Sequence, residues 1–582
     1  MALRIAALTA GEIAALPAPT RRALLLLAVG ADSPLAELLA AATRLGLGRA
    51  NVDRALHHAL VQVDGDRVDF RHALVRAQVL AASTGADVAE VHRALAGVTR
   101  DPTQAAWHRA AVATGPDQDV AGTLEDVAAR ATRHGARAEA VRALRRAAEL
   151  SGIDSDRARL LARAAETARE AGQVAAACDA LREGFALASD PAVVRELAVT
   201  EWVLGYTTGT PARHTTDALV DLALGMPRPD RSSVLLAAAA RTWVFETDAA
   251  VRARVGAALG PDPGADPLDE VARQTARALL DPVATGSGAG ALLRTALPDV
   301  VARRPRILPA CAFAAESAQD LATAAAYWDA GVEVFHAEGA VTDECLALAG
   351  RAGSLLARGR LAEAAADAEV GLRNATDLGL PLLAALNASA LARLGAWRGE
   401  RAATGQAAAR ARELSAGARC LVGLARTRWA TGLLDLLEEQ PAAALRRLHG
   451  LSVHPTTARW AVADLAEAAV AVGDLAQAEA AVLEADHVAR ATGSLALQAL
   501  VDRARGFLAG ETAAAGAHFA AAVSGGERAG NPLELARSRL AYGRWLRARG
   551  RTQQGQEALA QAAAGFERCG AVGWAARARH LA

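Results

Sequence analysis

The side chains best suited to bind an anion are two neighbours near the N-terminus, Arg71 and His72. A guanidinium and an imidazole both donate hydrogen bonds to phosphate or carboxylate oxygens, and an imidazole also changes its charge near neutral pH. The pair stands in the stretch 70–76, directly after an expected β-hairpin. Two interpretations stay open: the pair reads the phosphate of a nucleotide, or it only anchors the hairpin to the next helix.

The other residue patterns do not form a catalytic or metal-binding motif. All 64 basic residues are arginine, so the chain cannot supply the lysine of a Walker A loop. The glycine-rich stretch 286–290 follows no expected strand, and the neighbours His57 and His58 lie on different faces of a helix, where they cannot share a metal ion. No serine stands in a GxSxG elbow, and no cysteine has the local signature of a nucleophile. We therefore expect a protein that is not an enzyme, with no cofactor and no metal.

The composition favours closely packed helices. The chain has 582 residues, too many for one hydrophobic core, and is 52% hydrophobic but only 3% aromatic, so small side chains must fill the interior. The 64 acidic residues balance the 64 basic ones, which excludes a chain-wide basic field for nucleic acid. Five dispersed cysteines suit a reducing cytoplasm, and no apolar run is long enough to span a membrane.

A repeating pattern organises most of the chain. Counting forward from seven glycines, the fifth and twelfth residues are small and the ninth is apolar. Several of these glycines lie 37 or 40 residues apart, and a weaker copy starts at Glu439 with Ala444 and Leu448. The seven sets are Gly135 with Ala140, Leu144 and Ala147; Gly172 with Ala177, Leu181 and Gly184; Gly359 with Ala364, Ala368 and Gly371; Gly399 with Thr404, Ala408 and Ala411; Gly473 with Ala478, Val482 and Ala485; Gly510 with Ala515, Phe519 and Ala522; and Gly550 with Gly555, Leu559 and Ala562.

Small residues at fixed steps from a glycine turn allow the two helices of a hairpin to approach closely. The unit resembles the tetratricopeptide repeat, stretched beyond its usual ~34 residues. We therefore predict an all-α fold, a tetratricopeptide-like helical-repeat solenoid; the alternative is unpatterned alanine-rich helical packing. A solenoid has a concave face that can bind a protein or a small effector. Trp397, Trp429, Trp460 and Trp545 are candidates for that ligand or partner surface, and the alternative places them in the core.

The N-terminal region differs from the repeats. Helices are expected at 21–29, 35–45 and 52–60, and the alternating apolar residues of 61–70, with an Asp-Gly turn, predict a short hairpin. This order is typical of a winged helix. The expected wing carries Asp64, Asp66 and Asp69, which would repel phosphate, so we do not expect direct DNA binding.

Four regions follow from these patterns. We expect a winged-helix-like domain at 1–98, helical repeats at 99–205, an irregular helical segment or hinge at 206–309, and tetratricopeptide-like repeats at 310–582. The third region, 206–309, is assigned from clusters of proline and glycine that interrupt the helical periodicity.

The stretch 70–76 resembles a family, the large ATP-binding LuxR-type transcriptional regulators that include MalT. Their winged helix carries a matching phenylalanine-arginine-histidine, usually followed by proline, where this chain has Ala73. The resemblance covers both ends of the chain and is weak from about 205 to 330. Other matching stretches, in the same order along the chain, are 16–26, 105–108, 115–117, 138–150 and 566–575.

In that family an AAA-like ATPase precedes the winged helix, and a LuxR-type helix-turn-helix follows the repeats. The resemblance therefore implies the middle and C-terminal repeat region of such a regulator, without the ATPase and without the DNA-binding domain. It implies a non-catalytic sensor or scaffold that binds a protein or small effector, with Arg71 and His72 sensing a nucleotide held by an ATPase domain in cis or in trans. The alternative function is a stand-alone tetratricopeptide-like interaction scaffold with no transcriptional role.

Overall fold

A computed structural model describes residues 13–209, 215–245, 248–260, 266–416 and 420–582. Helices dominate these ranges, and the two strands found in them pair with each other, so the predicted all-α class is confirmed. None of the helices in these ranges combines the length and the apolar composition needed to cross a bilayer. The chain divides into two units, Met1–Ala164 with Glu183–Ala188 and Ala165–Arg182 with Ser189–Ala582, and each is described by itself.

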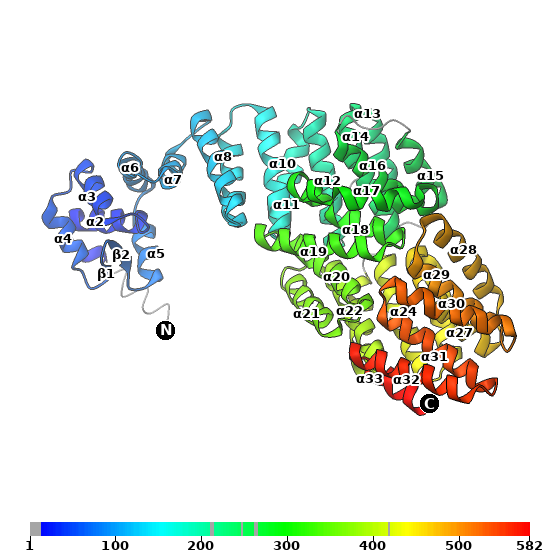
Figure 1. Cartoon of the computed structure of the whole chain (residues 1–582). Helices are drawn as coiled ribbons and strands as arrows, with labels where there is room; N and C mark the ends of the chain where they lie inside the picture. Colours follow the sequence, from blue (N-terminus) through cyan, green and yellow to red (C-terminus); the bar gives the residue numbers. More distant parts are fainter. Residues whose placement is uncertain (1–12, 210–214, 246–247, 261–265, 417–419) are drawn as a thin grey trace. The chain divides into compact units, whose positions relative to one another are not determined.

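The first unit begins with three helices and a hairpin, in the order expected from the sequence (Figure 1). The strands pair Val61 with Phe70 and Val63 with Val68, and Gly65 takes the positive φ of the turn. The third helix ends at Leu56 instead of residue 60, because residues 57–60 turn back toward the first strand. The elements are α2 (Ala18–Val29), α3 (Leu35–Arg44), α4 (Arg49–Leu56), β1 (Val61–Asp64), β2 (Arg67–Phe70), α5 (Ala73–Ala81), α6 (Gly85–Ala96), α7 (Pro102–Val112), α8 (Gln118–Arg133) and α9 (Arg137–Leu150).

The second unit is built from antiparallel helix pairs, of which α20–α21, α22–α23, α29–α30 and α31–α32 pack most extensively. Two helices, α10 (Asp154–Glu170) and α11 (Val174–Leu187), are divided between the units. The helices up to residue 317 are α12 (Pro191–Thr208), α13 (Thr216–Gly225), α14 (Arg228–Phe245), α15 (Ala249–Ala258), α16 (Pro267–Leu280), α17 (Pro282–Arg303), η1 (Pro305–Ile307) and α18 (Leu308–Ser317).

The remaining elements of the second unit complete the solenoid (Figure 1). They are α19 (Leu321–Glu338), α20 (Val341–Ala357), α21 (Leu361–Asp377), α22 (Pro381–Arg398), α23 (Arg401–Ser415), α24 (Leu421–Leu437), α25 (Pro441–His449), η2 (Gly450–Val453), α26 (Pro455–Trp460), α27 (Val462–Val472), α28 (Ala476–Thr492), α29 (Leu495–Leu508), α30 (Ala513–Ala529), α31 (Pro532–Ala548), α32 (Thr552–Cys569) and α33 (Val572–Leu581).

The segment 206–309, expected to be an irregular helical segment or hinge, contains the helices α13–α17 and η1 in its described part. Pro267, one of the prolines that suggested an interruption, is the first residue of α16, and Pro282 starts α17 in the same way. Proline suits a first helical turn because its missing N–H has no partner there anyway. The glycine-rich stretch 286–290 lies in α17, and there the non-helical backbone of Gly286 (φ +54°, ψ −149°) interrupts the helix with a kink.

The glycine pattern predicted from the sequence marks real turns. All seven glycines have φ between +63° and +86°, a left-handed conformation that glycine adopts without steric cost. Every residue predicted to lie at a close helix approach is buried, in all seven sets. The weaker copy is also real, since Glu439 has φ +59° and Ala444 and Leu448 are buried.

A second series of turns was missed. Gly339, Gly379, Gly493, Gly530 and Gly570 also have positive φ and connect one helix pair to the next. Gln319 takes the same conformation, so from Gln319 through Gly399 a left-handed residue recurs every 20 residues. The 40-residue interval seen in the sequence is therefore two turns, one inside the hairpin and one between hairpins.

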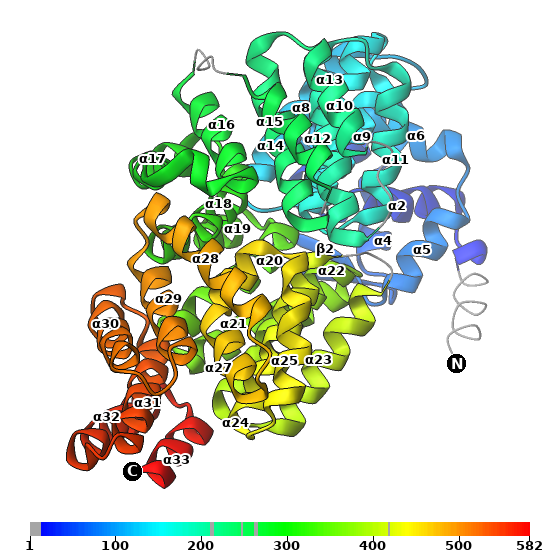
Figure 2. The ribbon, with the colours of Figure 1, turned by 90° about the vertical axis from the view of Figure 1, so that its right-hand side faces the viewer.

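The solenoid coils so that distant helix pairs touch within the second unit. Hydrogen bonds join Thr342 to the carbonyl of Arg169 (2.7 Å), Ser494 to that of Gln319 (2.7 Å) and Trp574 to that of Ala396 (3.2 Å). These partners are 173, 175 and 178 positions apart in the sequence. Figure 2 shows the result, with α28–α33 lying alongside the column of helices from α20 to α27.

A buried ion cluster reinforces this contact near the start of the unit. The guanidinium of Arg169 binds the carboxylates of Glu166 (2.9 Å) and Asp343 (2.8 Å), and Arg306 binds Glu166 at 3.2 Å. Burial would raise the pKa of the Glu166 carboxyl, but Arg169 and Arg306 hold it well below its usual range. The cluster therefore ties α10 to α20 and to η1, across one turn of the coil.

Candidate functional site

The pair Arg71 and His72 lies at the junction of β2 and α5. His72 is the residue before the first turn of α5, and both side chains are exposed. The backbone N–H of Arg71 donates to the carbonyl of Leu60 at 3.1 Å, so the main chain holds this junction. Within the described ranges neither side chain makes a hydrogen bond or an ion pair, and both stay accessible to a ligand, as the nucleotide-sensing prediction requires.

The four candidate tryptophans do not share one open face. Trp397 and Trp429 are buried; the ring of Trp397 packs against Trp574, and the Nε1–H of Trp429 donates to Asp464 at 2.8 Å. Trp460 and Trp545 are partly buried. Trp429 and Trp460 line the same interior hollow, whereas Trp545 stacks on Tyr542 elsewhere. The core interpretation therefore describes Trp397 and Trp429 better than a surface role does.

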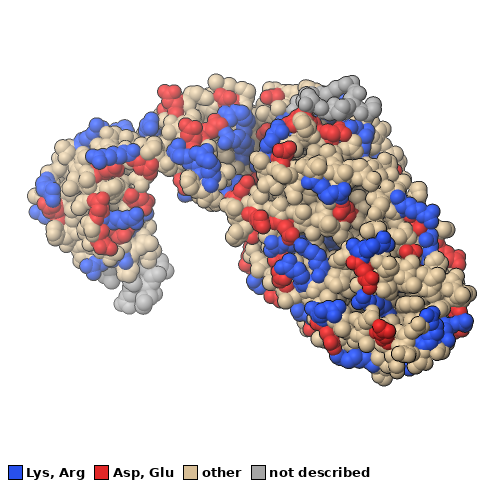
Figure 3. Space-filling view, viewed as in Figure 1, with Lys and Arg blue, Asp and Glu red and all other residues tan. Residues whose placement is uncertain are grey.

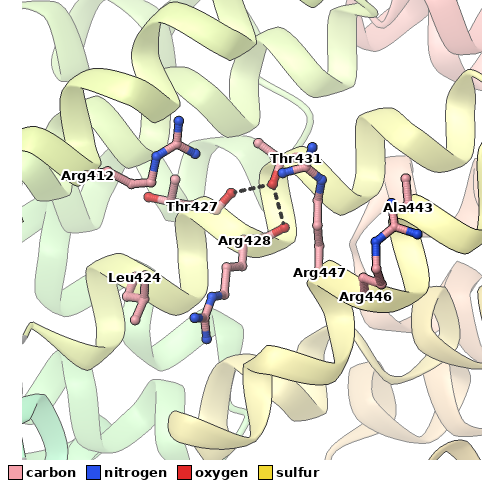
Figure 4. Close-up of a pocket in the computed structure, with 8 residues that line it drawn as sticks. All are labelled: Arg412, Leu424, Thr427, Arg428, Thr431, Ala443, Arg446 and Arg447. Atoms are coloured by element: carbon pink, nitrogen blue, oxygen red, sulfur yellow. Dashed lines mark hydrogen bonds between the residues drawn. The ribbon is translucent and has the colours of Figure 1, made fainter.

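A hollow of the second unit lies between α23, α24 and α25 and has a volume of about 410 Å³. We call it the arginine groove. Figure 4 shows one arginine from α23 and two from α25 converging on residues of α24. Its lining residues are Arg412, Leu424, Thr427, Arg428, Thr431, Ala443, Arg446 and Arg447.

The charge of the groove is one-sided, because four arginines and no acidic residue line it. The guanidinium of Arg447 pairs with Asp435 at 2.6 Å, and Arg428 donates to the carbonyl of Gly450 at 2.7 Å. Arg412 and Arg446 are exposed, and neither forms an ion pair with any residue of the described ranges. The groove therefore has two guanidiniums available to a ligand.

Local sequence explains how these side chains are positioned. On α24, residues 424, 428 and 431 follow the spacing that places them on one face of a helix. On α25, Arg446 and Arg447 occupy the last turn, where the helix dipole favours a cation. The hydroxyl of Thr431 donates to the backbone of its own helix, and Figure 4 marks these bonds. Guanidiniums so placed can bind carboxylate or phosphate oxygens in bidentate pairs.

The face of the surface drawn in Figure 3 carries both signs of charge. Figure 3 shows arginines and acidic residues interspersed over the face in view. Sequence reasoning did not find the groove, although the adjacent Arg446 and Arg447 were visible. Arg412 lies 34 positions away, and only the packing of α23 on α24 brings it to the same hollow.

Comparisons with known proteins give no family for this chain. No protein-family model matches it, and no curated protein matches it. Among solved structures it is similar to the Cut9–Hcn1 hetero-tetramer of the APC/C, with 13% identity, a TM-score of 0.32, and coverage of 79% of this chain and 95% of the other. It is also similar to IFIT1 with m7Gppp-AAAA, with 12% identity, a TM-score of 0.24, and coverage of 76% and 90%. At these scores the likeness carries no inference about function.

Proposed function

We propose that this chain is a non-catalytic helical-repeat scaffold that binds an acidic segment of a partner protein in the arginine groove. The observation that carries the proposal is the exposure of Arg412 and Arg446 in a groove that has no acidic residue in its lining. A carboxylate-rich segment would complete the ion pairs that the two guanidiniums lack. Because the chain as a whole is neutral, nucleic acid is a poorer match than a short acidic segment.

Charge reversal tests this proposal with a fluorescein-labelled hexaglutamate peptide as the probe. We expect the double variant Arg412→Glu, Arg446→Glu to bind the peptide at least about tenfold more weakly, since a loss of ~1.4 kcal/mol corresponds to a tenfold change. Fluorescence anisotropy of the full chain at about 0.1 M ionic strength measures the affinity, and added salt should weaken binding to the unchanged chain.

The matched control is the double variant Arg549→Glu, Arg551→Glu, which makes the same change of charge at two exposed arginines outside the groove. We expect it to keep the affinity within about twofold, because charges beyond the Debye length of about 10 Å are largely screened. Equal losses in the two double variants would show that the peptide responds to overall charge, and would reject the groove as its site.

A second candidate function follows from the first unit. We propose, as the alternative, that the chain acts as the sensor and scaffold part of a LuxR-type ATP-binding regulator, with Arg71 and His72 reading a partner-held nucleotide. Three helices, a hairpin and two exposed anion-binding side chains ahead of helical repeats support this alternative. Labelled ADP would be titrated into the chain with and without a candidate ATPase domain. If His72→Ala changes neither titration, the sensor function is removed.

A further inference from the structure

Two adjoining hollows lie between helices of the second unit, and they share His454 and Thr456 in their linings. We call them together the inner cavity. The smaller hollow has a volume of about 70 Å³ and the larger one a volume of about 260 Å³. The smaller is lined by Arg393, Arg426 and Trp429 among others, and the larger by Arg252 and Arg459. The cavity is thus bounded by basic side chains from α15, α22, α24 and α26.

Arg393 is a cation without a carboxylate partner. Its guanidinium carbon lies 3.6 Å from the centre of the Trp429 ring, and its Nε has no hydrogen-bond partner in the described ranges. Burial lowers the pKa of Arg393 to about 10, with partial compensation from Glu534, so the side chain is still charged at neutral pH. A stacked guanidinium keeps its edge available for a planar anion.

His454 is 2% exposed and supplies a neutral donor between the two hollows. Its Nδ1 accepts the backbone N–H of Thr457 at 3.3 Å, which assigns the proton to Nε2. Burial, together with Arg426, Arg459 and Arg252, lowers the pKa of His454 to about 3. A backbone group of Trp243 acts in the opposite direction and raises this pKa. Even so, Nε2 makes no hydrogen bond of ordinary geometry with a described residue. The cavity therefore contains a buried N–H group in need of an acceptor.

The acidic residues around the cavity are already engaged. Glu316 accepts from Arg426 at 2.8 Å and from Trp328 at 2.9 Å, and Glu484 pairs with Arg459 at 2.8 Å. Glu534 pairs with Arg503 at 2.7 Å, and Asp281 accepts two backbone N–H groups at the start of α17. By contrast, the one hydrogen bond found for the Arg252 side chain within the described ranges goes to the carbonyl of Leu280. The unsatisfied groups of the cavity are donors, and a ligand must bring acceptors.

We propose that the inner cavity binds a small organic anion through carboxylate or phosphate oxygens. Arg393 supplies charge to the smaller hollow, Arg252 supplies charge to the larger one, and the Nε2–H of His454 donates between them. The site is separate from the arginine groove, because the two share no lining residue. An anion bound here contacts α15, α22 and the start of α26, which are far apart in the sequence, and stabilises their packing.

Calorimetric titration of the full chain with succinate and, separately, with inorganic phosphate tests the proposal and distinguishes the two sources of oxygen acceptors. We expect saturable binding of at least one of them with one site per chain, and a rise in the thermal midpoint at saturation. Arg393→Gln and Arg252→Gln are two independent variants, so that binding can still be measured in one of them if the other fails to fold. Each should weaken binding at least tenfold.

Arg549→Gln is the matched control, because it removes one exposed guanidinium that lines neither the inner cavity nor the arginine groove. It should not change the affinity for succinate or phosphate. Absence of binding by both anions at millimolar concentration would overturn the proposal. So would binding that survives both cavity variants or that is lost in Arg549→Gln. Because the hexaglutamate measurement depends on other residues, failure here leaves the proposed scaffold function unaffected.

Discussion

Replacement of Asp464 by alanine is expected to remove about 3–5 kcal/mol of the unfolding free energy, the usual effect of breaking a buried ion cluster. Asp464 is 1% exposed on α27. One carboxylate oxygen accepts from the Nε1–H of Trp429 at 2.8 Å, and the other from Arg537 at 2.8 Å. Arg503 lies 3.6 Å away. Asp464→Ala therefore leaves two buried guanidiniums with less opposing charge.

The remaining partners cannot replace Asp464. Arg537 also binds Glu467 at 2.6 Å, and Arg503 binds Glu534 at 2.7 Å. Both acids are therefore already engaged, and Glu467 also pairs with Arg544 at 3.3 Å. Urea denaturation followed by tryptophan fluorescence measures the change. The control is Glu363→Ala, which breaks a pair whose two side chains are about half exposed and which should change the stability far less. Equal, small losses in the two variants would show that the cluster does not stabilise the coil.

Gly573→Ala is expected to destabilise the chain by about 1–3 kcal/mol through overpacking. A Cβ at this position would lie 2.8 Å from the carbonyl oxygen of Arg398 and 2.9 Å from the Cα of Gly399. Both are backbone atoms, so no side-chain rotation can relieve the clash. Gly573 lies in α33, and its conformation is helical, so the expected loss reports the close approach of two turns of the coil and not backbone strain.

The control for Gly573→Ala is Gly405→Ala in α23, where a Cβ would meet nothing within 4 Å. There alanine should stabilise by up to about 1 kcal/mol, because glycine is a poor helix former. Thermal unfolding of both variants compares the two effects under one condition. Stabilisation by Gly573→Ala as well would mean that α33 does not pack against the turn at Gly399.

The part of the fold set by local rules was predictable. Left-handed turns require glycine and close helix contacts require small side chains, so both leave a periodic signal in sequence. The second series of turns escaped because Gln319 stands where glycine is expected, and because glycine is common throughout the chain. Pro267, one of the prolines read as an interruption of 206–309, instead starts α16.

The candidate sites were not predictable in the same way. Arg412 and Arg446 come from different helices, and Arg393 and Arg252 from helices about 140 positions apart. No local pattern brings such residues together, since their proximity depends on how the solenoid coils. The tryptophans of the repeat region were candidates for ligand anchors, yet Trp397 and Trp429 are large rings buried in the core. Arg71 and His72 were identified locally and do lie exposed at a junction of elements.

Disulfide trapping tests most directly the central claim, that successive turns of the second unit touch. A Cβ at Gly359 would lie 3.4 Å from the Cβ of Cys569, close to the separation found in disulfides. Burial raises the pKa of the Cys569 thiol, so Gly359→Cys would be oxidised with diamide at pH 8.5 and mapped by mass spectrometry.

Gly379→Cys is the control, because its φ is also positive and a Cβ there would meet nothing within 4 Å. The coiled solenoid predicts a disulfide that joins position 359 to Cys569, and none between position 379 and Cys569. If Cys569 stays reduced in Gly359→Cys while the exposed Cys178 is oxidised by diamide, the two turns are not in contact. That result would contradict the coiled solenoid.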